Sequence, residues 1–170
     1  MLAAPAAASS MPKADLSGHS VSLGSAPSLA ADVSLSPQWS LGFSTAMPFY
    51  YEAFGFFRYD LRSTYTLLQT ENLVMRGVLG IFGDLDPFQR EDFPLAPIGL
   101  EAGMSLAYQM HPMVVLRVNF VAGIGFSRSE RWGLFPPGGG IELAFQPFEQ
   151  FEASAGFNGN GDIFALRYLF

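Results

Sequence analysis

Charged side chains lie on the polar face of several alternating segments of the chain, and ion pairing is the chemistry that they could perform. Five arginines and four acids share one face of these segments, so their charges nearly balance. Paired charges can be satisfied in a confined space, whereas unpaired ones are costly. We expect a polar core cross-linked by ion pairs; the alternative is a charged constriction for a small solute. The residues are Arg58, Asp60, Arg62, Arg76, Glu101, Arg117, Glu142, Glu152 and Arg167.

A second group of acids lies within the segment 83–96. It consists of Asp84, Asp86, Glu91 and Asp92. Carboxylate oxygens are the ligands that hard divalent cations prefer. The spacing of these four acids matches no familiar metal-binding loop, however. We therefore interpret the segment as a solvated acidic loop and expect no metal site.

Catalytic chemistry has little support in the sequence. The chain contains two histidines and no cysteine, so it has no thiol nucleophile and no thiolate metal ligand. His19 precedes Ser20 near the N-terminus, and His111 precedes Pro112 in an expected turn. Neither histidine has the serine and acid neighbourhood that a catalytic triad requires. We therefore assign no catalytic residue, and we expect neither enzymatic activity nor a cofactor.

The elements that must position these side chains are β-strands, because apolar residues alternate with small or polar ones. Between the strands stand turn signals, of which the NGNG of 158–161 is a strong hairpin signal. The alternation is weaker over 73–82, and two short alternating stretches, 21–24 and 29–35, come first. The clear stretches are 39–47, 57–67, 98–108, 114–126, 141–146, 150–157 and 162–170.

The composition bears on which face of these strands meets water. Charged residues make up 14% of the chain and aromatic residues 15%, whereas soluble domains average about 25% charged residues. No run of 18 apolar residues could form a transmembrane helix. The net charge of −6 argues against nucleic acid, which requires a basic surface. A soluble barrel with an apolar inside has the same period, but small residues on the polar face and aromatic residues near strand ends favour an apolar outside.

The last nine residues carry a more specific signal. Phe164, Leu166, Tyr168 and Phe170 share one face of the final strand, and the chain stops on a phenylalanine. This ending resembles the C-terminal strand of bacterial outer-membrane β-barrels, and in size the chain is similar to the small OmpA-type and OmpX-type barrels. The resemblance implies a location in the bacterial outer membrane, a barrel-closing role for this strand, and recognition of the strand by the barrel-assembly machinery. It also implies a periplasmic C-terminus.

We therefore expect an all-β fold, a single antiparallel up-and-down transmembrane β-barrel over residues 18–170. Eight strands run from Trp39 to Phe170, and ten would result if 18–35 supplied two more. Counting back from a periplasmic C-terminus makes the segments 83–96 and 127–138 external. Long connections on one side and tight turns on the other are typical of outer-membrane barrels. Residues 1–17 are interpreted as the remnant of a signal peptide or as a flexible N-terminus.

The function expected from these observations is that of a non-enzymatic outer-membrane barrel with a charge-filled lumen. Its external loops would serve recognition or envelope structure. The residues Arg128, Arg131 and Trp132 could pair with the loop acids or contact phosphates of lipopolysaccharide. The expected partners are membrane lipid and lipopolysaccharide, with no nucleic acid. The alternatives are a narrow pore for small solutes and a lipid A-modifying enzyme; an envelope protein partner has no signal for or against it.

Overall fold

The computed structural model describes residues 11–15, 18–47, 57–85, 97–126, 131–133 and 137–170. Within these residues the chain forms eleven β-strands. The strands follow the predicted alternating stretches, because a period of two places one set of side chains on each face of the sheet. They are β1 (His19–Gly24), β2 (Ser28–Ser34), β3 (Trp39–Ala46), β4 (Phe57–Gln69), β5 (Leu73–Leu85), β6 (Ile98–His111), β7 (Val114–Phe126), β8 (Arg131–Gly133), β9 (Gly140–Phe148), β10 (Phe151–Asn158) and β11 (Phe164–Leu169).

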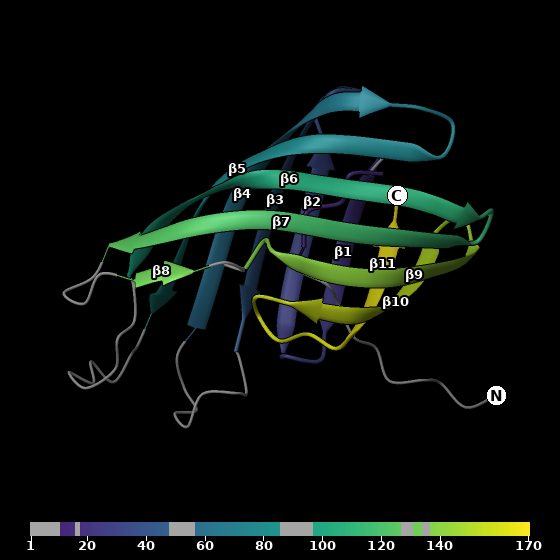
Figure 1. Cartoon of the computed structure of the whole chain (residues 1–170). Helices are drawn as coiled ribbons and strands as arrows, with labels where there is room; N and C mark the ends of the chain where they lie inside the picture. The colour runs from purple at the N-terminus through teal and green to yellow at the C-terminus, as the bar shows by residue number, and fades with distance from the viewer. Residues whose placement is uncertain (1–10, 16–17, 48–56, 86–96, 127–130, 134–136) are drawn as a thin grey trace.

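Ten of these strands form a closed antiparallel barrel of up-and-down topology (Figure 1). Neighbours in the chain are neighbours in the wall, and β7 pairs with β9. The barrel closes where β1 pairs with β11, with Ser22 opposite Arg167. The three-residue β8 is an appendage on β7, where it pairs with Gly123–Gly125.

The strand count corrects the expectation of eight and agrees with the alternative of ten. The two N-terminal stretches are full members of the wall: β1 pairs with β2 over six residue pairs and β2 with β3 over six. Without them, β11 and β3 would each present an unpaired edge, which is unfavourable. Closure through β1 therefore requires both strands.

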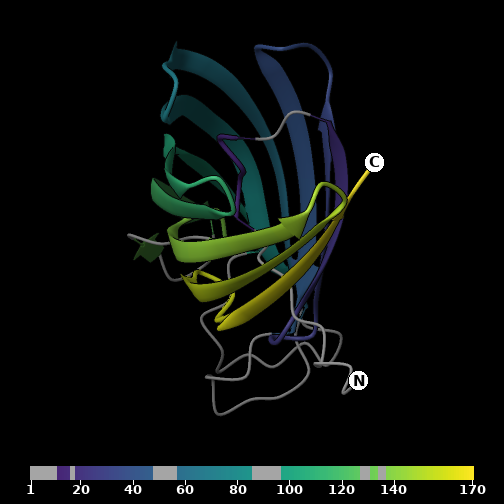
Figure 2. The same cartoon turned by 90° about the vertical axis from the view of Figure 1, so that its right-hand side faces the viewer.

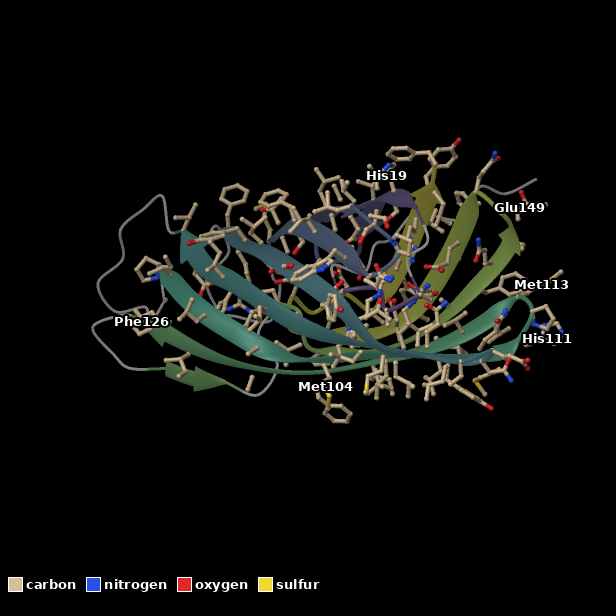
Figure 3. The ribbon with its side chains drawn as sticks, turned by 90° about the horizontal axis from the view of Figure 1, so that it is seen from above. His19, Met104, His111, Met113, Phe126 and Glu149 are labelled. Carbon is tan, nitrogen blue, oxygen red and sulfur yellow. The ribbon has the colours of Figure 1, made fainter. Side chains whose placement is uncertain are left out.

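The apolar face of the wall points outward and the charged face inward. Phe43 and Phe120 are 44% and 60% exposed, whereas Arg117 and Glu142 are 0% and 2% exposed. Met104, in the middle of β6, lies on the outer side in Figure 3 and is also exposed. This orientation is the reverse of that in a soluble barrel, whose apolar residues form the core.

The weak alternation in the sequence of β5 has a structural cause. Its inward positions include Arg76, Val78 and Phe82, which are all buried, so apolar residues occur on both faces. The strand also continues to Leu85. Asp84, which we expected in the following loop, is therefore part of the wall and points inward.

The two ends of the barrel differ. At the turn end, defined by the segments 34–39, 69–73, 111–114 and 148–151, short turns join the strands. At the loop end lie the termini of β3, β5 and β7 from which the longer connections leave. Figure 3 shows His111, Met113 and Glu149 at the turn end and Phe126 at the loop end.

The wall is uneven in height. Strands β4 to β7 have 13 or 14 residues, whereas β1, β2 and β11 have six or seven. On the low side the apolar exterior extends past the strand ends, with Leu35 61% and Ile163 57% exposed. The described residues contain no helix of the length and apolarity needed to cross a membrane.

Candidate functional site

The barrel interior gathers all nine charged residues that the sequence placed on one face; each is at most 8% exposed. The strand register explains much of their pairing. Arg58 is directly opposite Asp84, Arg117 is opposite Glu142, and Glu152 is opposite Arg167. Opposed residues on one face of an antiparallel pair have neighbouring Cβ atoms, so their side chains can meet.

The largest group is the Arg117 cluster. The Arg117 guanidinium donates to Glu142 Oε1 at 2.9 Å and to both oxygens of Glu152 at 2.8 and 2.6 Å. It also donates through Nε and Nη2 to the two oxygens of Asp15, both at 2.7 Å. Arg167 Nη1 donates to Glu152 Oε1 at 3.2 Å, and Lys13 Nζ lies 3.6 Å from Glu142 Oε1. Three cations thus balance three anions, as a buried ion-pair network requires.

The second group, the Arg62 cluster, occupies one row across five strands. Asp32, Gly42, Arg62, Gly80 and Glu101 are successive register partners from β2 to β6. Arg62 Nη2 donates to Asp32 Oδ1 at 3.1 Å, and Nη1 donates to Asp60 Oδ2. Three acids surround this single arginine.

Glycines between the charged residues make this row possible. A Cβ on Gly42 would lie 2.5 Å from Asp32 Oδ1 and 2.8 Å from Arg62 Nε. A Cβ on Gly80 would lie 2.8 Å from Glu101 Oε1. The long side chains therefore lie directly on the backbone of the strand between them, where no other residue type leaves room.

Further hydrogen bonds hold Arg58 and Arg76, the two remaining arginines. Arg58 Nε donates to Asp84 Oδ1 at 2.7 Å, and its Nη1 donates to the carbonyl oxygen of Gly159 at 2.8 Å. Arg76 Nη1 donates to Ser40 Oγ at 3.0 Å, and this hydroxyl lies 2.6 Å from Thr64 Oγ1. Arg58 thereby ties the wall at the loop end to the β10–β11 turn.

The N-terminal segment Met11–Asp15 contributes to the same interior, where the sequence suggested flexibility. Figure 2 shows it as a short purple trace within the ring of strands, and Met11, Pro12 and Ala14 are buried. The carbonyl oxygen of Pro12 accepts from Ser105 Oγ at 3.2 Å and from Asn119 Nδ2 at 3.1 Å. Burial tends to raise the pKa of Asp15, but the Arg117 guanidinium outweighs it and holds that pKa well below the ordinary value.

Segments at the loop end also fold inward. Pro137–Gly140 and Asn158–Asn160 are buried, and Gly159 N donates to the carbonyl oxygen of Gly139 at 2.9 Å. Asp162 is fixed by Ser28 Oγ at 2.9 Å and Asn158 Nδ2 at 2.9 Å. A cavity of about 460 Å³ opens at the turn end, where Asp15, His19, Gln69 and Arg76 are among its lining residues.

Sequence reasoning missed five interior charges: Lys13, Asp15, Asp32, Asp84 and Asp162, the last of which was placed only at the start of the closing stretch. Asp32 lay on the predicted polar face, and its position opposite Gly42 follows from counting β2 as a wall strand. Asp84 was assigned to a loop because the length of β5 was underestimated. Lys13 and Asp15 had no signal, because they lie outside any alternating stretch and enter the barrel through tertiary contacts alone.

Several predicted loop residues fall outside the described residues: Asp86, Glu91, Asp92 and Arg128. Arg131 and Trp132, expected in a loop, have their backbone in β8, opposite Gly125 and Ile124 of β7. The segment 127–138 therefore contains a short strand. Of the closing strand, Phe164, Tyr168 and Phe170 are exposed on the outer face and Leu166 is half-buried.

The two histidines lie at the turn end, where His19 lines the same cavity as Asp15 and Arg76. His19 is exposed and its ring lies 6.0 Å from that of Phe170. His111 is exposed and its Nδ1 accepts from the backbone N–H of Met113 at 3.3 Å. Among the described residues, no three or more His, Asp or Glu side chains are grouped as metal ligands. The described interior thus offers ion pairing and hydrogen bonding as its chemistry.

The chain matches no protein-family model and no curated protein.

Proposed function

We propose that this chain is an integral barrel of the bacterial outer membrane with a closed interior, and that its loop end presents the surface for recognition. The observation that carries the proposal is the inverted distribution of its residues. Large apolar side chains cover the outer wall on every strand of the barrel, while the charged residues of the wall are buried inside. In water such an exterior would be a very large exposed apolar patch.

Aromatic residues on the outer wall support the membrane location. Near the turn end, eight exposed aromatic side chains form one group: Trp39, Tyr65, Tyr108, Phe145, Phe148, Phe151, Tyr168 and Phe170. Near the loop end, a second group consists of Phe57, Phe126, Phe157 and Phe164. Between them the exposed residues are largely aliphatic, as in Leu41, Leu61, Leu79 and Leu100. Two aromatic girdles around an aliphatic band are typical of outer-membrane barrels.

The filled interior supports a non-conducting role. The Arg117 cluster and the Met11–Asp15 segment occupy the middle, and the inward-folded segments at 137–140 and 158–160 occupy the loop end. Side chains that are nine-tenths or more buried and joined by ion pairs leave little space for hydrated ions. Because the interior is closed, a partner would bind at the exposed loop end.

The membrane location is tested by fractionation. The protein is expected in the detergent-requiring outer-membrane fraction, and to migrate faster on SDS gels unheated than after boiling, as closed barrels in membranes do. Recovery of a folded, monodisperse protein in buffer without detergent would refute the proposal. Purified protein in planar bilayers is expected to give no steady ion current.

A narrow pore is the second candidate, and the cavity of about 460 Å³ at the turn end favours it. This cavity reaches Asp15, so an opening already leads from one side to the N-terminal segment. A steady, ohmic current from the unmodified protein would establish the pore and exclude the closed barrel.

A further inference from the structure

The N-terminal segment Met11–Asp15 contacts the barrel as a peptide ligand contacts a binding site. Three of its polar groups are received by side chains of the wall, while the Lys13 ammonium also donates to the Met11 carbonyl oxygen at 2.8 Å. The Asp15 carboxylate is held by two hydrogen bonds from Arg117, both at 2.7 Å. The Pro12 carbonyl accepts from Ser105 of β6 and Asn119 of β7, and the Lys13 ammonium faces Glu142 of β9 at 3.6 Å.

The segment runs lengthwise through the interior. Gly18, which leads into β1, lies beside the C-terminal Phe170 at the turn end, since a Cβ on Gly18 would be 3.4 Å from the Phe170 carbonyl oxygen. Met11 lies toward the loop end: a Cβ on Gly140, the first residue of β9, would be 2.6 Å from Met11 Sδ. The five residues therefore occupy the path between the turn-end cavity and the loop end.

The wall is complete without this segment. Closure depends on the pairing of β1 with β11, and Met11–Asp15 takes part in none of the strand pairings. Departure of the segment would remove one cation, Lys13, and one anion, Asp15, so the interior charge would not change. Arg117 would keep Glu142 and Glu152, and Glu142 would keep Arg117 and Ser154, whose Oγ donates at 3.1 Å. After the segment has left, the charges that remain in the Arg117 cluster are therefore still balanced, and no uncompensated buried charge destabilises the barrel.

We propose that the inner surface of β6, β7, β9 and β10 is a binding site for a short peptide, and that Met11–Asp15 is its resident ligand. The site recognises a lysine followed two residues later by an acid, with a main-chain carbonyl before the lysine. The resident segment can leave this site while the barrel remains folded. The proposal rests on the closed barrel described above, but its tests in detergent do not depend on the cellular location.

The first test measures how often the segment leaves. Because the chain has no cysteine, Ala14→Cys places a single thiol at a fully buried position. Its rate of reaction with a charged maleimide in detergent is compared with that of the same variant carrying Asp15→Lys, which sets a second cation against Arg117. Loss of charge-assisted hydrogen bonds predicts an increase of about tenfold or more. Asp15→Glu should retain protection, and Glu71→Lys, in an exposed turn, is the control.

The second test measures the site itself. A fluorescent synthetic peptide with the sequence of Met11–Asp15 is expected to bind the Asp15→Lys variant, detected by anisotropy, and not the unmodified protein, whose site is occupied. A peptide with asparagine in place of its aspartate should bind at least about tenfold more weakly. Unchanged strand content by circular dichroism shows that the barrel remains folded.

Three results would overturn the proposal. One is equal protection of the introduced thiol in the Asp15→Lys variant and its Ala14→Cys parent. Another is loss of strand content in that variant, because the segment would then be part of the folded wall. The third is absence of peptide binding by a variant whose introduced thiol has become reactive. None of these results bears on whether the barrel resides in a membrane, which fractionation decides separately.

Discussion

Replacing Arg117 with methionine tests the Arg117 cluster most directly. The guanidinium is fully buried and serves three carboxylates, those of Asp15, Glu142 and Glu152. With Lys13 and Arg167 the cluster holds three positive and three negative charges, so its net charge falls from zero to −1 in the variant. Removing one partner of a buried ion pair costs about 3–5 kcal/mol.

The remaining contacts set where in this range the loss should fall. Glu152 keeps Arg167 at 3.2 Å, Glu142 keeps Lys13 at 3.6 Å, and the Asp15 side chain is 25% exposed to water. Because each carboxylate retains a partner or solvent, we expect the free energy of unfolding to fall by about 3 kcal/mol, the low end of the range. Urea unfolding in detergent micelles, followed by tryptophan fluorescence, measures it.

A double variant separates charge from packing. Adding Glu152→Gln to Arg117→Met restores charge balance, so about 1 kcal/mol or more should be recovered. Glu149→Gln, an exposed change at the turn end, should alter the unfolding free energy by less than about 0.5 kcal/mol. A loss below about 1 kcal/mol in Arg117→Met, or no recovery in the double variant, would refute the reasoning.

Three further predictions concern the interior. Gly42→Ala should lower the unfolding free energy by about 1–3 kcal/mol in the same urea assay, because the new Cβ would overlap Asp32 and Arg62, whereas Gly77→Ala, whose Cβ would meet Leu67 at 3.6 Å, should be nearly neutral. Asp15→Lys should give a steady current in planar bilayers where the unmodified protein gives none; equal silence would show that the emptied path is still closed. The contribution of the peptide's aspartate to binding should be fully present above the ordinary aspartate pKa and be lost progressively as the pH falls from there through the lowered pKa that Arg117 gives Asp15 in the folded chain. Among the charged groups that face it, namely Arg76, Arg117, Arg167, Lys13, Glu142 and Glu152, the cations dominate; release of the peptide already at about pH 5, above the ordinary aspartate pKa, would contradict this.

The wall could be predicted because its information is local. A period of two in Trp39–Met47 or Val114–Phe126 fixes strand and face together, and Arg117, on the polar face of the second stretch, is one of the charges that the structure buries. The sequence left eight and ten strands both open, because short stretches such as 21–24 do not reveal whether they pair. Whether such a stretch pairs depends on which strand lies beside it in the closed barrel. The sequence of β1 does not show that β11 will be its neighbour.

The sequence by itself determined that this protein is built of alternating strands with charges on one face, because side-chain alternation is a property of each strand alone. Which acid meets which arginine was decided largely by register, which sets residues far apart in the chain opposite one another, as with Arg117 and Glu142. The glycines at 42 and 80 gain their role only when a neighbouring strand lays a guanidinium or carboxylate across them. The place of Lys13 and Asp15 depended on tertiary structure entirely, because only a closed barrel creates the interior that receives them.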